Sequence, residues 1–101
     1  APSTALRLTD GARTVAFSGD TEWTEALLPI AAGADLFICE SYMFEGSPVG
    51  HMAYRTIVER REDLAAKRIL LTHMSDGMWA RRDEVDAAYF TVAEDGLVLD
   101  L

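Results

Sequence analysis

The sequence predicts an α/β fold in which helices pack on a β-sheet. Short apolar runs alternate with segments of helical spacing, in the order strand, helix, strand, helix, strand, helix, hairpin. Two runs, 36–39 and 69–72, are continuously apolar, which is typical of strands covered on both faces. Three helices are few for two faces, so we expect the second face to require a partner, either a missing half of the same protein or another copy of the chain.

The chain begins with a predicted β-hairpin. Segments 5–9 and 14–18 alternate apolar and polar residues, as half-buried strands do. Asp10-Gly11 stands between them, and this pair favours a tight turn.

A helix is expected over 22–32. Thr21 or Asp20 is suited to cap its first turn. Pro29 lies inside the segment and should bend or shorten the helix, and Gly33 is the natural stop.

The middle of the chain predicts strand, loop, helix and strand. The strand at 36–39 is followed by a loop at 45–50, which is rich in Gly and contains Pro. A second helix is expected over 51–65, where apolar residues recur at helical spacing, and 69–72 is the next strand.

The chain is expected to close with a third helix over 81–88 and a second hairpin. The strands of that hairpin would be 89–93 and 97–101, joined through Asp95-Gly96.

Composition limits the functional classes. The 101 residues suit one small domain, so residues 1–101 are expected to form a single unit. Seventeen acidic residues against nine basic ones, a formal charge of −8, disfavour a nucleic-acid partner for this segment. No run is long enough for a membrane span and no signal peptide is evident, and the single Cys39 cannot form an internal disulfide. These features favour a cytoplasmic protein.

Polar residues stand where predicted strands end. Asp20, Glu40 and His73 occupy such positions, and side chains there commonly face a ligand crevice in α/β sheets. An aspartate and a histidine together suit a divalent metal ion, although two ligands alone would hold it poorly. Local alternatives remain: Asp20 or His51 as a helix cap, His73 as a polar strand terminus, and Glu40 as a solvated loop residue.

Four runs, taken together and in order, resemble the metallo-β-lactamase superfamily. They are Phe-Ser-Gly-Asp-Thr at 17–21, Ala-Asp-Leu-Phe-Ile-Cys-Glu at 34–40, His51 opening a helix, and Lys-Arg-Ile-Leu-Leu-Thr-His-Met at 67–74. The nearest branches are the ribonuclease Z-like and phosphodiesterase-like proteins. The resemblance covers about 6–101 and implies the C-terminal half of an αββα sandwich, with a mixed sheet and about three helices on one face.

The resemblance also implies roles for four residues. Asp20 would bridge two divalent metal ions, and His73 would bind one of them. The ions would be zinc, with manganese or iron as alternatives. Glu40 would orient His51, which would assist proton transfer to the leaving oxygen. The histidine-rich signature of the family, His-x-His-x-Asp-His, is absent, since His51 and His73 are the only histidines.

Two functions are therefore predicted. In the first, the chain is part of a metal-dependent hydrolase, a phosphodiesterase for a small phosphodiester or nucleotide. By itself the chain would be inactive and would hold few metal ions or none. In the second, it is a non-catalytic fragment or interaction module that forms a homodimer through its open sheet face.

Overall fold

A computed structural model describes residues 5–19, 21–46 and 50–99, and its mixed sheet with helices confirms the α/β prediction. The strands are β1 (Leu6–Thr9), β2 (Thr14–Phe17), β3 (Leu36–Glu40), β4 (Ile69–Thr72) and β5 (Phe90–Val92). The helices are α1 (Leu27–Ala31), α2 (Tyr54–Leu64), α3 (Asp76–Ala80) and the short 3₁₀ helix η1 (Arg82–Glu84). Within the described part of the chain, no helix is long and apolar enough to cross a bilayer.

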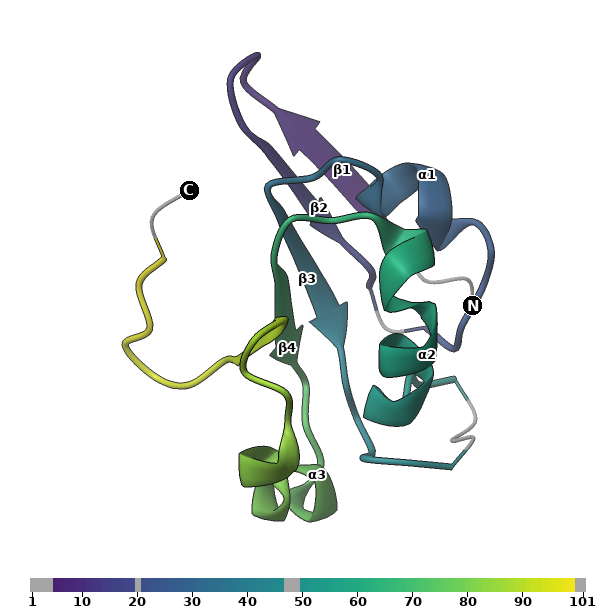
Figure 1. The fold of residues 1–101 in the computed structure, drawn as a ribbon, viewed down its shortest axis with the longest axis vertical. Coiled ribbons are helices and arrows are strands. Elements are labelled where there is room, and N and C mark those ends of the chain that lie inside the picture. Colours follow the sequence, from purple (N-terminus) through teal and green to yellow (C-terminus); the bar gives the residue numbers. More distant parts are fainter. Residues whose placement is uncertain (1–4, 20, 47–49, 100–101) are drawn as a thin grey trace.

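The five strands lie in the sheet in their sequence order (Figure 1). β1 and β2 form the expected antiparallel hairpin, and β2, β3, β4 and β5 run parallel to one another. The carboxyl ends of β2, β3 and β4 therefore meet at one edge of the sheet. α3 lies beyond the end of β4, at the same edge (Figure 1).

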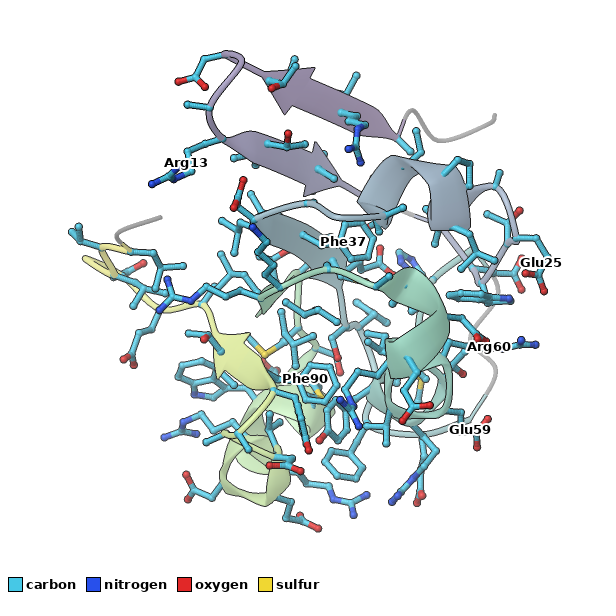
Figure 2. The ribbon with its side chains drawn as sticks, turned by 45° about the horizontal axis from the view of Figure 1, so that its top comes forward. Arg13, Glu25, Phe37, Glu59, Arg60 and Phe90 are labelled. Atoms are coloured by element: carbon cyan, nitrogen blue, oxygen red, sulfur yellow. The ribbon has the colours of Figure 1, made fainter. Side chains whose placement is uncertain are left out.

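One face of the sheet is covered by α1 and α2, which lie side by side (Figure 1). Phe37, Cys39 and Leu71 point into this layer and are fully buried. Figure 2 shows the rings of Phe37 and Phe90 between the sheet and the helices. The hydrophobic core of the described residues is thus built on a single face of the sheet.

The opposite face is also apolar, but it is open at the β1–β2 hairpin. Residues directly opposite each other share a face, and the pairs there include Leu6 with Phe17 and Leu8 with Val15. Leu6, Leu8 and Phe17 are 46%, 65% and 37% exposed. We call this surface the open face; its other members are Leu36, Ile38 and Leu70 of β3 and β4.

The first helix is shorter than predicted. α1 starts at Leu27 rather than at residue 22, and its N-cap is Ala26 rather than Thr21 or Asp20. Pro29 thereby occupies the first turn, where a backbone N–H has no intrahelical acceptor and its loss costs nothing. Gly33 ends the segment as expected, with a φ of 69°.

The C-terminal predictions need two corrections. The third helix covers Asp76–Ala80 rather than 81–88, because the Ser75 side chain caps it by accepting a hydrogen bond from the Met78 N–H. The closing hairpin is wrong for its described part. Phe90–Val92 joins the sheet parallel to β4, and residues 97–99 form no strand. Residues 100–101 lie outside the described part of the chain.

Candidate active site at the carboxyl ends of the strands

Two buried serines join the ends of the parallel strands. The Ser18 N–H donates to the Ile38 carbonyl, and the Glu40 N–H donates to the Ser18 hydroxyl at 3.1 Å. The Ser41 N–H donates to the Thr72 carbonyl at 2.9 Å. These bonds fix the residues that follow β2, β3 and β4 relative to one another.

Glu40 is not the solvated loop residue of the simpler alternative, because only 1% of it is exposed. Its Oε1 lies 2.9 Å from Nδ1 of His51, and its Oε2 accepts the Met52 N–H at 2.6 Å. Both carboxylate oxygens therefore hold the segment that carries His51. A buried carboxylate is tolerated when it is paired and hydrogen-bonded in this way.

His51 lies outside the cap of the second helix, which begins at Tyr54 with Ala53 as its N-cap. Its Nδ1 faces the Glu40 carboxylate, which can only accept, so the proton of the neutral ring belongs on Nδ1. Nε2 is then the nitrogen available to a substrate. The side chain is 32% exposed, which leaves it accessible from solvent.

His73 follows β4 with a φ of 53°, a left-handed conformation that is unfavourable for a residue other than glycine. Such strain is concentrated at functional sites. The rings of His73 and His51 are 5.6 Å apart, and Glu40, His51 and His73 each offer a ligand atom within 4.8 Å of the others. The structure thus brings together three of the four predicted site residues.

Asp20, the fourth predicted site residue, lies outside the described residues. Its predicted role as a bridging metal ligand stays a prediction. The neighbouring Ser18 and Gly19 are buried at the end of β2, beside Glu40.

Tyr42 is a site residue that the sequence did not reveal. Its ring stacks on His51 at 4.3 Å and lies 5.6 Å from the ring of His73. Its N–H donates to the Met52 carbonyl, and its carbonyl accepts the Ser75 N–H, each at 2.9 Å. Tyr42 therefore packs against both histidines, whose own rings lie 5.6 Å apart, and it fixes the backbone on both sides. The sequence signal that could have identified Tyr42 as a site residue was its position two residues after Glu40, just beyond the end of β3.

Cys39 precedes Glu40 but takes no part in the site. It is fully buried in the helix-covered core, and this burial raises the pKa of its thiol to about 12. A thiol with so high a pKa is inert as a nucleophile and as a metal ligand.

Comparison with known proteins identifies the family of this arrangement. The family model of the beta-lactamase superfamily domain matches residues 2–74. The probable metallo-hydrolase YhfI of Bacillus subtilis is 32% identical over 73 residues, which cover 69% of this chain and 30% of YhfI. Ribonuclease Z of Methanothermobacter thermautotrophicus is 38% identical over 66 residues, covering 60% of this chain and 22% of the relative.

The solved structures agree on the fold. The crystal structure of the metallo-beta-lactamase fold protein YhfI superposes with a TM-score of 0.75 at 27% identity. The match covers 95% of this chain and 43% of the YhfI chain. This chain therefore spans less than half the length of the proteins that it matches.

Proposed function

The chain belongs to the beta-lactamase superfamily, within which it is similar to ribonuclease Z, and from this premise we propose that it is part of a metal-dependent hydrolase that cleaves a small phosphodiester. The single observation that carries the proposal is the Glu40–His51 pair, with Nε2 of the imidazole left free beside His73.

His51 acts as the general acid in this proposal. Its Nδ1–H is donated to Glu40, so an imidazolium at this position can release only the proton on Nε2. The bond between phosphorus and the leaving oxygen breaks, and that oxygen takes the Nε2 proton. Water adds its hydroxyl to phosphorus, and its remaining proton returns the imidazole to the charged form. General acid catalysis of this kind contributes about 10²- to 10⁴-fold.

The donor set fits divalent metal ions, with His73 and Asp20 as ligands. In this proposal Glu40 orients His51 rather than holding metal, because its two oxygens accept hydrogen bonds from the segment that carries His51. Imidazole nitrogen and carboxylate oxygen suit zinc best, and manganese or iron less well. When bound, two such ions would lower the pKa of a bound water and neutralise charge on the phosphoryl oxygens.

The remaining ligands would come from sequence outside this chain. His73 and Asp20 are fewer donors than a two-metal site requires. The chain covers only 30% of YhfI and 22% of the ribonuclease Z. Residues 1–101 would then be the C-terminal half of one domain, and the missing half would also cover the open face.

A small substrate fits the charge of the chain better than RNA does. The name ribonuclease Z denotes a protein that cleaves RNA, whose linkages are phosphodiesters. This chain carries nine basic against seventeen acidic residues, so it offers little to neutralise a long polyanion. We therefore favour a compact phosphodiester or nucleotide as the substrate.

The test compares two leaving groups with the full-length protein that contains this sequence. p-Nitrophenolate leaves without protonation, whereas methoxide from dimethyl phosphate requires a proton. For His51→Ala, we expect kcat for dimethyl phosphate to fall about 10²-fold or more, and the loss for bis(p-nitrophenyl) phosphate to be much smaller. Equal losses for both substrates would contradict the role of His51. Activity that survives exhaustive chelation would contradict metal dependence.

The open face supports a second candidate, an interaction module that pairs with itself. Leu8 is 65% exposed there, and an uncovered apolar strand pair is a common association surface. If this is right, sedimentation of the 101-residue chain shows a dimer. Leu8→Glu should convert the dimer to a folded monomer, whereas Glu59→Lys, an exposed change on α2, should not.

A further inference from the structure

A cleft of about 180 Å³ borders His51 on the side of the first helix. Its walls come from three parts of the chain: residues 22–23, Gly46 with residues 51–53, and Thr56 of α2. His51 is therefore shared between the Glu40 pair and this cleft. A group placed in the cleft would lie next to the residue proposed to protonate the leaving oxygen.

Trp23 gives the cleft a flat apolar wall. The indole packs against the core, and the Arg60 guanidinium lies 5.1 Å from its ring centre. Arg60 is itself held by Asp63 at 3.6 Å and by Glu25 at 3.8 Å. Figure 2 shows Arg60 and Glu25 together at the outer edge of the helices. These contacts support the ring against the core.

The indole also carries a polar group without a partner. Nε1 of Trp23 is buried and has no hydrogen-bond acceptor among residues 5–19, 21–46 and 50–99. Buried donors are nearly always paired, so an unpaired one requires an explanation. The unpaired donor shows that the surroundings of this indole are incomplete within the described residues.

The charge of the cleft limits what it accepts. Glu22 contributes a carboxylate to the lining, and none of the described lining residues is Lys or Arg. An anionic group would meet this carboxylate, and His51 is the only described lining residue that can carry a positive charge. Met52 and Ala53 add apolar surface beside the indole. The lining thus favours a flat, uncharged group over a phosphate or a carboxylate.

We propose that this cleft binds the leaving group of the substrate, as a flat and uncharged aromatic or heteroaromatic alcohol. The inference rests on the function proposed above. The ring of the alcohol packs on Trp23, and its oxygen is presented to Nε2 of His51. The cleft thereby selects which of the two ester bonds of an asymmetric phosphodiester is broken.

Three synthetic phosphodiesters test this selection in the full-length protein: dimethyl phosphate, methyl benzyl phosphate and methyl 4-carboxybenzyl phosphate. We expect methyl benzyl phosphate to release benzyl alcohol, with kcat/KM about ten-fold above that of the carboxylated compound. Glu22→Gln removes the carboxylate from the lining, so it should reduce the ratio of the two kcat/KM values. Equal rates for the neutral and the carboxylated substrates would overturn the inference.

Variants at Trp23 test the contribution of its aromatic ring. Trp23→Leu should lower kcat/KM for methyl benzyl phosphate about ten-fold, with little change for dimethyl phosphate. Trp23→Phe, which keeps a smaller aromatic ring, should give a kcat/KM between those of Trp23→Leu and the unchanged protein. The ratio of the kcat/KM values for the two substrates, measured in one preparation, does not depend on how much of the protein is folded. The matched control is Trp79→Leu, since Trp79 also lies under an arginine but does not line the cleft. An equal loss for both substrates in Trp23→Leu would contradict the proposed site.

A binding measurement keeps this inference separate from the proposed function. Trp23 and Trp79 are the only two tryptophans, so their indole N–H resonances are an internal comparison. Benzyl alcohol should shift the Trp23 resonance and leave that of Trp79 in place. If no phosphodiester is cleaved but this shift occurs, the proposed function is wrong, while the cleft is still a binding site for an aromatic alcohol. If the Trp23 resonance does not move, the cleft is not such a site.

Discussion

The two faces of the sheet have similar apolar residues but different surroundings. On the helix-covered face, Phe37, Cys39 and Leu71 are fully buried beneath α1 and α2. On the open face, Leu6 and Leu8 of the hairpin are 46% and 65% exposed. Apolar character therefore does not tell which face is the core of this chain. Coverage does: within the described residues the open face is uncovered at the hairpin, although Leu36 in β3 is only 8% exposed.

The predicted site connects the two faces, because Glu40 follows Leu36 and Ile38 of the open face at alternate positions along β3. Glu40 extends from β3 and holds His51 just ahead of α2, and α2 packs in the covered layer. The acid–base pair can therefore be formed by this chain without the cover of the open face. The metal ligands proposed to come from elsewhere would arrive together with that cover.

Thiol labelling should show the largest difference between the faces. Burial raises the pKa of Cys39 to about 12, so almost no thiolate exists at pH 8 in the folded chain. We expect a cysteine placed on the open face, Phe17→Cys in a Cys39→Ala background, to react with a disulfide reagent roughly 10³-fold faster than Cys39. Similar rates would mean that the helix layer opens readily.

Truncating an aromatic ring on each face compares their contributions to stability. Phe37→Ala should lower the free energy of unfolding by about 3–5 kcal/mol, because it leaves a cavity under the helices. Phe17→Ala removes the same ring where it is 37% exposed, and should cost less than about 1 kcal/mol. Urea titrations of the two variants measure both values. A larger loss for Phe17→Ala would show that the open face is covered.

Glu40→Ala tests whether the site is tied to the covered layer. The change removes the acceptor of the His51 ring and leaves the buried Met52 N–H unpaired. We expect a loss of about 1–3 kcal/mol in the free energy of unfolding. Glu59→Ala, an exposed glutamate on α2, is the matched control and should change stability by less than about 0.5 kcal/mol. Equal losses of unfolding free energy in the two variants would mean that Glu40 does not hold the segment of His51 and Met52 in place.

Acid sensitivity should be the smallest effect, and it arises at the opposite edge of the sheet. The Thr14 N–H, followed by Lys67, holds the pKa of Asp35 below its usual value of 3.8. Because the folded pKa is the lower one, this carboxylate stabilises the fold above pH 4 and loses that effect as the pH falls further. Asp35→Asn should therefore weaken the dependence of the melting temperature on pH below about 4. A dependence that is unchanged in the variant would contradict this.

The strands could be predicted because their signal is local. The apolar runs of β3 and β4 and the Asp10-Gly11 turn lie within a few residues, and the structure confirms all three. The position of Pro29 explains why α1 is short, since the helix begins where the ring is tolerated. α3 was missed because a cap at Ser75 outweighs the glycine in its first turn.

The site was predictable only in part, because its contacts join distant residues. Glu40 and His51 are eleven positions apart, and their hydrogen bond depends on the loop between them. Only the resemblance to a family paired them beforehand. The cluster of the Tyr42, His51 and His73 rings arises from the meeting of three loops, and no periodic pattern encodes it.

The most direct test of the central claim is the tautomer of His51, measured from the ¹⁵N shifts of its ring in metal-free protein. Glu40 accepts from Nδ1, so the neutral ring should carry its proton on Nδ1, and Nε2 should be free. In Glu40→Ala the neutral ring should instead carry its proton mainly on Nε2, because this is the usual tautomer of a free imidazole. A neutral His51 protonated on Nε2 in the unchanged protein would contradict the account, since Glu40 would not then be orienting it.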